Sequence, residues 1–580
     1  MRAITGRILF LAALILALVG GAAGVLHGLH APQALAASPQ SRAAVAAAAD
    51  TNTNTNTATA TNTATATNTA TVTNTPTATA TVTATITPTA TITPTATNTG
   101  TLVPTSTGTA TATPLPGSPT SDYFAEGYTG LAATNGRATF TEVLNILNPN
   151  SSIAAPITIT YYIQGPSTST VMTVTRTVNA QTVLRESVNT DVGNDKIVAA
   201  VISSSRRVYA TRTMTRVSPT GQRLDSSTTL PTTAPGTSWG FAEGYTGVTF
   251  QEYLTVLNPS STQANVNILL APQAATDAGA RTLNFTVPAL SRVTENIRSL
   301  NQGNSAQSVG MLIGSDQPIV PERVLYFGDG GGSGKFGSTV SAGVSTPSTS
   351  QSFAFGSSGG ATATGSGLNS LGNQDYITLL NPSLSAASTA AVTFHTVAGQ
   401  QIGQPVSVTL APGTRRTVIA NTSLGTSAVN VFSASLNATA PVDAESAQYF
   451  DGSPNIGSHP GVDFPGQASA TTDAILTDIS TELAGGVDVT RDLYLYNPGA
   501  ASIQVAATYF GGNGSTATAT YNVPAGGVLD ASVDSDTQSA IPPGAVGAEL
   551  KVTSGSFIAY AVGLTTDGLS ATEDIGIPAY

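Results

Sequence analysis

The chain has 580 residues, too many for a single hydrophobic core, so it should divide into several domains. It contains no cysteine, which excludes disulfide frameworks, thiolate metal sites and cysteine nucleophiles. Only 9% of the residues are charged and the net charge is −11, which argues against nucleic-acid binding because that requires a basic face.

The first residues follow the order of an export signal: basic, then apolar, then small. Arg2 and Arg7 precede an apolar run over residues 8–26, and a small-x-small cleavage site ends at Ala36. The apolar run is also just long enough to cross a bilayer. We therefore expect residues 1–36 to be either a cleaved signal peptide or an N-terminal membrane anchor helix. Any contact with a membrane should be made by this segment alone.

The next segment is dominated by threonine. From Thr51 onward, threonine occupies nearly every second position, alternating with alanine, asparagine and valine and interrupted by prolines. There is no large apolar side chain to bury, so nothing offsets the entropic cost of ordering the chain. We predict that residues 37–121 form a disordered, Ala/Thr-rich spacer.

Internal repetition is the strongest signal in the rest of the chain. The heptapeptide Phe-Ala-Glu-Gly-Tyr-Thr-Gly occurs at residues 124–130 and again at 241–247, and a weaker copy begins at Phe353. An apolar strand ending in Asn-Pro occurs four times, each followed by a segment resembling Val-Pro-Ala and by a closing apolar strand. The period is domain-sized, so each repeat should own a core. The predicted repeats are 122–235, 236–350, 351–466 and 467–580.

Each repeat is expected to be an immunoglobulin-like β-sandwich. Within residues 250–327 of the second repeat, short runs rich in β-branched and aromatic residues are separated by turn residues. About six or seven such strands per domain is typical of an immunoglobulin-like sandwich. The sequence therefore predicts an all-β protein, a rod of tandem immunoglobulin-like sandwiches behind the signal and the spacer.

The second repeat carries the run FAEGYTG…FxEYLxxLNP…VPAxSR…PIVxERxxYF. This pattern resembles a poorly characterised family of bacterial surface proteins built from such repeats. The resemblance covers about residues 122–465 and is weakest in the last repeat. It implies an exported protein, and it implies no catalytic residues.

Two charged positions are shared by the first two repeats and lost together from the others. Glu126 and Glu243 lie in the opening motif, and Arg212 and Arg323 lie at matching points of the closing strands. The third and fourth repeats have apolar or small residues at the positions that can be matched. We predict that Glu126–Arg212 and Glu243–Arg323 are ion pairs within one domain, joining its entering strand to its closing strand.

Aromatic residues near the opening motif have two interpretations. Tyr128 and Tyr245 follow the Glu-Gly turn, and Trp239 is the only tryptophan. Aromatic rings at the end of a sandwich can stack on sugars, and they can equally pack at a domain junction. Both interpretations are left open at this point.

Nothing in the sequence predicts a catalytic site, a cofactor or a metal site. Residues 236–240 match Gly-x-Ser-x-Gly, but no helix is expected after them, so we interpret them as a linker. His395 and His459 stand alone, in an expected strand and an expected loop. Calcium between domains stays open, although the acidic residues lack the spaced run that an oxygen cage requires.

We therefore expect a non-catalytic structural or adhesive protein that presents tandem sandwiches on a spacer, either secreted or held at the cell surface. The alternative is a carbohydrate-binding accessory protein of the cell envelope or extracellular matrix. The expected partners are a cell-wall or matrix polysaccharide or a surface protein, with no nucleic acid.

Overall fold

The structure is a computed structural model, and all the residues it describes belong to one compact unit, Thr97–Tyr580. The described residues are 120–579 without the internal segments 136–137, 222, 248–249, 274–280, 302–307, 328–336, 360–372, 425–429, 451–459, 484–485 and 567–570. The signal predicted for residues 1–36, and the spacer predicted for 37–121 except its last two residues, lie outside this part. None of the helices in the described part has the length and apolar character needed to cross a membrane.

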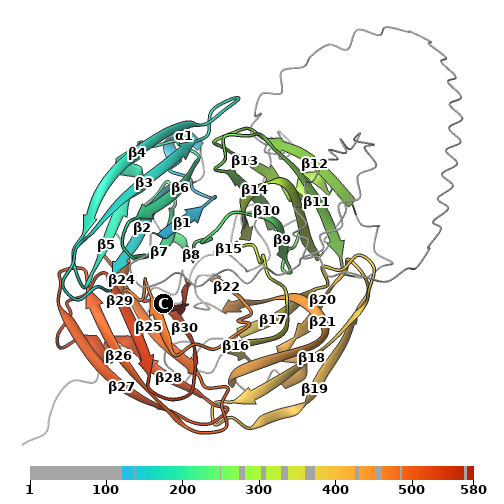
Figure 1. The fold of residues 1–580 in the computed structure, drawn as a ribbon, viewed down its shortest axis with the longest axis vertical. Coiled ribbons are helices and arrows are strands. Elements are labelled where there is room, and N and C mark those ends of the chain that lie inside the picture. The colour runs from blue at the N-terminus through green and yellow to red at the C-terminus, as the bar shows by residue number, and fades with distance from the viewer. Residues whose placement is uncertain are drawn as a thin grey trace, which may run out of the picture. The chain divides into compact units, whose positions relative to one another are not determined.

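The described residues form four β-sandwiches in tandem, which confirms the predicted all-β fold class (Figure 1). We number them in chain order: sandwich 1 is 120–232, sandwich 2 is 236–344, sandwich 3 is 348–467 and sandwich 4 is 471–579. Two elements begin earlier than the predicted boundaries. The first strand starts at Thr120 rather than after residue 121, and sandwich 3 starts at Ser348 rather than at 351.

Sandwich 1 has an outer sheet in the strand order β1–β6–β3–β4 and an inner sheet in the order β5–β2–β7–β8. Its elements are β1 (Thr120–Phe124), α1 (Ala132–Asn135), β2 (Thr139–Asn148), β3 (Ala155–Ile163), β4 (Thr170–Val178), β5 (Thr182–Ser187), α2 (Val188–Val192), β6 (Val198–Ser204), β7 (Tyr209–Val217) and β8 (Arg223–Thr229).

In sandwiches 2 and 3 one long strand, β14 or β21, runs through both sheets and replaces the separate β6 and β7. The elements of sandwich 2 are β9 (Gly236–Phe241), β10 (Phe250–Asn258), β11 (Ala264–Pro272), β12 (Arg281–Val287), β13 (Ser291–Asn296), α3 (Ile297–Leu300), β14 (Val309–Phe327) and β15 (Gly337–Ala342). Those of sandwich 3 are β16 (Ser348–Ser358), β17 (Asn373–Leu380), β18 (Ser388–Thr396), β19 (Gln401–Leu410), β20 (Arg415–Ile419), α4 (Ala420–Leu424), β21 (Asn430–Phe450) and β22 (Gly461–Pro465).

Sandwich 4 returns to two separate sheets, an outer sheet in the order β27–β26–β29–β23–β32 and an inner sheet in the order β24–β25–β30–β31, with β28 also paired to β25. Its elements are β23 (Asp473–Leu476), β24 (Glu482–Leu483), β25 (Val487–Tyr496), β26 (Ile503–Gly511), β27 (Thr516–Val523), β28 (Val528–Ser532), α5 (Val533–Thr537), β29 (Val546–Val552), β30 (Ile558–Thr565), β31 (Ala571–Ile575) and β32 (Ile577–Pro578).

The strand pairing resembles that of an immunoglobulin domain in its centre. The pairing of β2 with β5 and of β3 with β6 matches the B–E and C–F pairs of that fold. In contrast, β1 lies beside β6, where an immunoglobulin domain has its last strand. Alternating residues of β3 are buried, because successive side chains of a strand point to opposite faces, and those facing inward fill the core between the sheets.

The four Asn-Pro segments lie in the same surroundings in every sandwich. The Asn258 side-chain nitrogen donates to the carbonyl oxygens of Thr262 (2.7 Å), Val287 (3.1 Å) and Pro288 (3.1 Å), and its oxygen accepts from the backbone nitrogen of Ser260 (3.0 Å). The side chains with matching contacts are Asn148, Asn381 and Asn497. Each is fully buried, so this residue joins the Asn-Pro strand to the Val-Pro-Ala segment.

Contacts between sandwiches form a closed cycle. Each sandwich contacts the next, and sandwich 4 also contacts sandwich 1 (Figure 1). The last strand of the inner sheet in each sandwich contacts its counterparts in both neighbours, in the cyclic order β8, β15, β22, β31. The predicted rod is therefore wrong. A head-to-tail interface that repeats with a suitable rotation closes on itself instead of extending.

Candidate functional site: the buried junctions between sandwiches

Four buried side chains join sandwich 1 to sandwich 2, and we call them the first junction network: Glu126, Arg212, Arg292 and Glu322. Nη2 of Arg292 lies 3.0 Å from Oε2 of Glu126, and Nη1 of Arg212 lies 2.9 Å from Oε2 of Glu322. Each ion pair takes one partner from each sandwich. All four side chains are buried, so water does not screen these pairs as it screens a surface salt bridge.

Backbone and amide groups complete this network. Nε of Arg292 donates to the carbonyl oxygen of Ala125 (2.9 Å), and its Nη1 donates to Oε1 of Gln164 (3.2 Å). Oε2 of Glu322 accepts from the backbone nitrogen of Glu126 (2.7 Å). The opening motif of sandwich 1 is thus held by sandwich 2 through both its backbone and its carboxylate.

The second junction network, between sandwiches 2 and 3, repeats this arrangement with Glu243, Arg323, Arg415 and Glu445. Nη2 of Arg415 lies 3.0 Å from Oε2 of Glu243, and Nη1 of Arg323 lies 3.0 Å from Oε2 of Glu445. Arg415 also donates to the carbonyl oxygen of Ala242 (2.7 Å), whose backbone nitrogen donates to Glu445 (2.6 Å). Two successive junctions therefore use the same residue types in the same roles.

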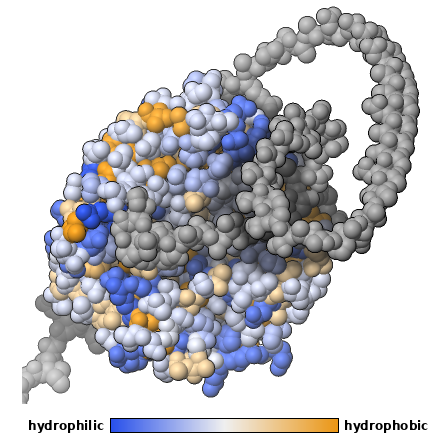
Figure 2. Space-filling model, in the orientation of Figure 1, coloured by the Kyte–Doolittle hydropathy of each residue, from blue (hydrophilic) through white to orange (hydrophobic). Residues whose placement is uncertain are grey.

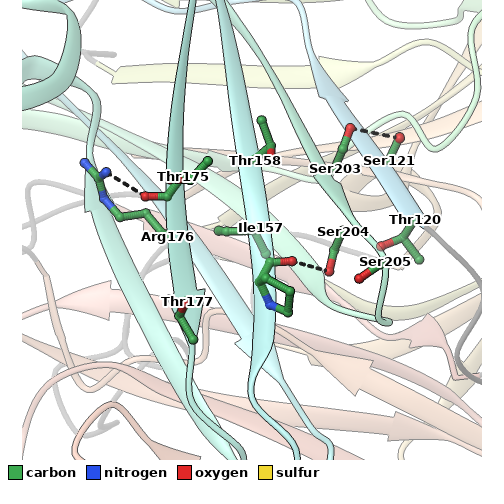
Figure 3. Close-up of a pocket in the computed structure, with 11 residues that line it drawn as sticks. Thr120, Ser121, Ile157, Thr158, Thr175, Arg176, Thr177, Ser203, Ser204 and Ser205 are labelled. Carbon is green, nitrogen blue, oxygen red and sulfur yellow. Dashed lines mark hydrogen bonds between the residues drawn. The ribbon is translucent and has the colours of Figure 1, made fainter.

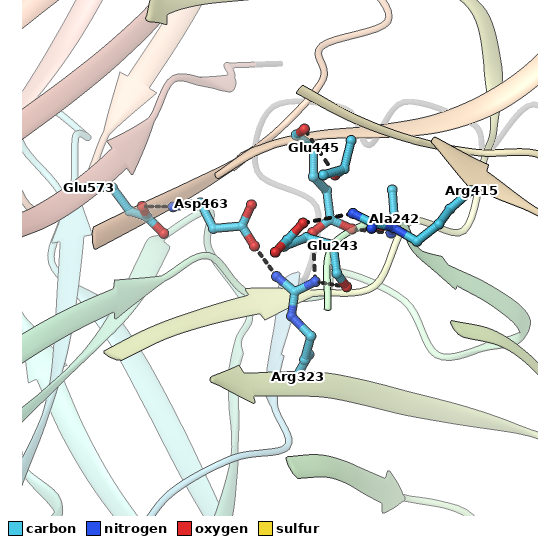
Figure 4. A network of polar contacts seen from close by, with 8 residues as sticks. Ala242, Glu243, Arg323, Arg415, Glu445, Asp463 and Glu573 are labelled. Atoms are coloured by element: carbon cyan, nitrogen blue, oxygen red, sulfur yellow. Dashed lines mark hydrogen bonds and ion pairs between the residues drawn. The ribbon is translucent and has the colours of Figure 1, made fainter. Parts of the chain in front are cut away.

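The second network continues into sandwich 4 (Figure 4). Arg323 also contacts the carboxylate of Asp463 in β22. The backbone nitrogen of Asp463 donates to Oε2 of Glu573 in β31 at 2.6 Å. One guanidinium of sandwich 2 thus binds an acid of sandwich 3 that is itself bonded to sandwich 4.

The predicted pairs Glu126–Arg212 and Glu243–Arg323 are wrong in their partners. Arg212 donates to the backbone carbonyl oxygen of Glu126, and Arg323 donates to that of Glu243. The glutamate carboxylates bind an arginine of the following sandwich instead. The residues vary together because the two sides of a junction change together.

A signal for the missed residues is present in the sequence. Arg292 and Arg415 follow the Val-Pro-Ala-like segment only in repeats two and three, the repeats that come after a glutamate-bearing repeat. By strand register, Val183 and Val528 occupy this position in sandwiches 1 and 4. Comparing each repeat with its successor, rather than within itself, would have found these arginines.

The junction between sandwiches 3 and 4 is aromatic. Phe355, at the position of the opening glutamate, stacks on Tyr494 with ring centroids 4.1 Å apart, and Phe464 stacks on Tyr560 at 4.5 Å. Tyr560 stands where the second and third sandwiches have the junction glutamate, and Val528 stands where they have the junction arginine. Both sides of this junction thus have apolar or aromatic residues where the first two junctions have charged ones. These residues belong to the same hydrophobic cluster as the core of sandwich 3.

The closing junction, between sandwiches 4 and 1, is of a third kind. By strand register Asp478 occupies the opening-glutamate position, and its Oδ2 accepts from Asn145 Nδ2 (2.9 Å) and Thr213 Oγ1 (3.0 Å). A cavity of ≈ 10 Å³ beside these groups has room for about one water molecule. Next to it, buried apolar residues of both sandwiches pack together: Leu147, Val183, Tyr209, Ile475 and Phe510.

A buried carboxyl group lies beneath each of the first two opening motifs. Burial raises the pKa of Glu142 and of Glu252 to about 8, against the opposing effect of the nearby arginines. Gly127 and Gly244 make room for them, because a Cβ at either glycine would lie 2.7 Å from a carboxyl oxygen. The same Cβ would lie even closer to a backbone carbonyl oxygen, 2.6 Å from that of Val198 at Gly127 and 2.4 Å from that of Val309 at Gly244, so both the backbone and the neighbouring acid require the glycine of the motif.

The structure assigns the predicted ligand-stacking aromatics to packing. Trp239 is 4% exposed and belongs to the core of sandwich 2, so the ligand-stacking interpretation is wrong for this residue. Tyr128 and Tyr245 are half-buried. The ring of Tyr128 packs edge-on against Phe140 with the ring centroids 4.8 Å apart, and that of Tyr245 packs edge-on against Phe250 with the centroids 4.9 Å apart.

The Gly-x-Ser-x-Gly match is neither a nucleophile elbow nor the predicted linker, because residues 236–240 form β9, which pairs with β14. Nε2 of His395 lies 3.2 Å from Oγ of Ser435, and His459 lies outside the described residues. In the part of the chain that the structure describes, no three His, Cys, Asp or Glu side chains are grouped to hold a metal ion.

An open groove of ≈ 830 Å³ lies on the outer sheet of sandwich 1 (Figure 3). Strand register places four hydroxyl residues in one row across the four strands of this sheet: Ser121, Ser203, Thr158 and Thr175. Arg176 also lines the groove, but its guanidinium binds Glu186 (2.8 Å) and Asp191 (2.7 Å). The groove therefore offers neutral hydroxyl groups more than charge.

No family model and no curated protein matches the chain. Among solved structures, the chain is similar to Thermotoga maritima 1070, with 14% identity over 19% of this chain and 94% of that one and a TM-score of 0.17. It is also similar to a tetra-tandem repeat from the extending region of a large adhesion protein, with 12% identity over 76% of this chain and 95% of that one and a TM-score of 0.10.

Proposed function

We propose that the protein is a non-catalytic structural or adhesive element, exported and displayed outside the cell, whose four sandwiches act as one rigid platform. The observation that carries the proposal is the location of the charged side chains. The chain has few charged residues, and those of the two junction networks are buried between sandwiches. Buried ion pairs are a costly way to join domains and favour one fixed arrangement.

The exposed surface supports the same proposal. On the face shown in Figure 2, hydrophobic residues lie in small separate groups among hydrophilic ones. Export is supported by the basic-apolar-small order of residues 1–36. A platform behind a spacer would present surface to a wall, a matrix or a neighbouring cell.

A second candidate, binding of a neutral polysaccharide, is favoured by the hydroxyl-lined groove of sandwich 1. Sugars are recognised by hydrogen bonds to hydroxyl groups, and this groove has such groups on four adjacent strands. The two candidates differ in whether a defined glycan binds at this one place.

Probing the full-length chain on an array of wall and matrix glycans, together with a retention assay on coated beads, separates them. The structural or adhesive proposal expects bead retention on cells or matrix without a defined glycan ligand. A glycan signal that falls in Thr158→Ala and Thr175→Ala, but not in the exposed control Thr409→Ala, would support the second candidate. Breakdown of any arrayed glycan would contradict both.

A further inference from the structure

The outer sheet of each sandwich has an edge strand that can in principle pair with another chain. Among the described residues, the outer sheet of each sandwich, or in sandwiches 2 and 3 the half of the sheet that matches it, ends in a strand with one paired side: β4, β12, β19 and β27. An edge strand presents unpaired backbone N–H and C=O groups to any chain that can align with it, and natural proteins block such edges with charge, proline or bulges.

Three of the four edges carry such a block. The β4 edge carries the charged Arg176, which is paired with Glu186 and Asp191. The β12 edge begins at Arg281. The β19 edge contains Pro405, and its pairing with β18 has an irregular register.

The fourth edge, β27, carries none of these. Its sequence from Thr516 to Val523 is Thr-Ala-Thr-Ala-Thr-Tyr-Asn-Val, with no charge and no proline, and its register with β26 is unbroken. Thr516, Thr518 and Thr520 are exposed, while Ala517 packs toward the core. Among described elements, β27 has substantial contacts only with β26, β28 and α5 of its own sandwich.

The sequence of this edge also suits one partner in particular. Residues 516–520 read the same in both directions, so two copies aligned antiparallel about a two-fold axis at Thr518 place Thr516 opposite Thr520 and Ala517 opposite Ala519. Threonine then meets threonine on the exposed face, alanine meets alanine on the core face, and no like charges oppose each other.

We propose that β27 is a self-association edge, through which two copies of the chain pair antiparallel and join their outer sheets of sandwich 4 into one continuous sheet. The interface is isologous, so it closes at the dimer. A single strand pair buries little surface, so the dimer should be weak and concentration-dependent. This goes beyond the platform function, because it states how two platforms are joined.

Sedimentation of the full-length chain over a range of concentrations tests this, with Thr518→Lys as the disrupting variant. Lysine at the two-fold axis sets two ammonium groups opposite each other, and the exposed position leaves the fold intact, so we expect a dissociation constant raised about fivefold or more. The matched control is Ser407→Lys on the blocked β19 edge, which should leave the dimer unchanged.

Thiol cross-linking identifies the occupant, because the chain has no cysteine of its own. Thr518→Cys should form a disulfide between two copies faster than Ser407→Cys. A chain that stays monomeric, or a dimer that Thr518→Lys leaves unaffected, overturns the proposal. So does a dimer that Thr518→Lys abolishes but in which two Thr518→Cys residues never join, since the occupant is then another segment of alternating threonine and alanine, such as residues 57–61 of the partner.

Discussion

At the scale of single residues, the arginines of the two junction networks hold neighbouring sandwiches together. Arg292 and Arg415 are almost fully buried and satisfy three acceptors each across a junction. Removing such a group leaves a buried carboxylate without its partner, which costs more than the pair itself contributes.

We therefore expect Arg292→Ala to lower the free energy of unfolding by about 3–5 kcal/mol, since it leaves Glu126 buried and unpaired. Urea unfolding followed by circular dichroism measures this. The control is Arg206→Ala, an exposed arginine of sandwich 1, which should leave the unfolding curve in place. Equal effects of the two variants would mean that the first junction network does not join the sandwiches.

The buried carboxyl groups predict how stability depends on pH. Burial raises the pKa of Glu142 and of Glu252 from the ordinary 4.5 to about 8, so folding takes up protons between these values. Their stabilising contribution is complete below pH 4.5 and is lost as the pH rises through about 8. Each group should lower the free energy of unfolding by about 1.4 kcal/mol per pH unit in that window.

Unfolding by urea at several pH values between 5 and 8 checks this dependence. Glu142→Gln keeps the shape but does not titrate, so it should flatten the slope, whereas Asp488→Asn, at an exposed position, should not. Stability that increases with pH over this range would show that these carboxyl groups are ionised in the folded protein.

At the scale of elements, the buried asparagine defines how each sandwich closes. Asn258 donates to three carbonyl oxygens, and of these only that of Thr262 has a second side-chain donor, Oγ of Ser260. Asn258→Ala should lower the melting temperature of the protein and reduce the free energy of unfolding by about 2–3 kcal/mol. Asn284→Ala, at an exposed strand position, serves as the comparison. If both variants lose the same small free energy of unfolding, Asn258 does not hold the sandwich closed.

The elements also show what the sequence could predict. The Asn-Pro and Val-Pro-Ala segments were recognisable as separate anchors, and alternation of apolar residues predicted the strands, because both signals act within one repeat. The partners of Glu126 and Glu243 were not predictable in the same way. Two residues that pair within one repeat and two residues that each pair across a junction would both be missing together from the other repeats. Only the fold distinguishes these two cases.

Trp239 and the closing contact illustrate the same limit. A lone tryptophan at a repeat boundary suggests a binding surface, but β9 begins directly at that boundary and turns the ring into the core. Tandem repeats suggest a rod, and nothing local to any one repeat reports the rotation between sandwiches that brings Asp478 back to Asn145.

At the scale of the whole set of sandwiches, the four junctions are of three kinds: ionic twice, aromatic once and mixed at the closure. A face built for an arginine cannot accept a phenylalanine without burying an unpaired charge, so the differences help fix the order in which sandwiches meet. The closure between sandwiches 4 and 1 combines hydrogen bonds to Asp478 with apolar packing, and this contact makes the arrangement a closed cycle and not an open row.

The most direct test of the account is a disulfide across that closure, in a chain that has no other cysteine. A Cβ at Gly514 lies 3.7 Å from Cγ2 of Thr182, close enough for Thr182→Cys and Gly514→Cys to bond within one molecule. The control places the second cysteine at Gly403 in β19 of sandwich 3, which like Gly514 has a positive φ and where a Cβ meets nothing within 4 Å. The closed cycle predicts an intramolecular disulfide in the first variant only. Free thiols, or disulfides only between molecules, would contradict it.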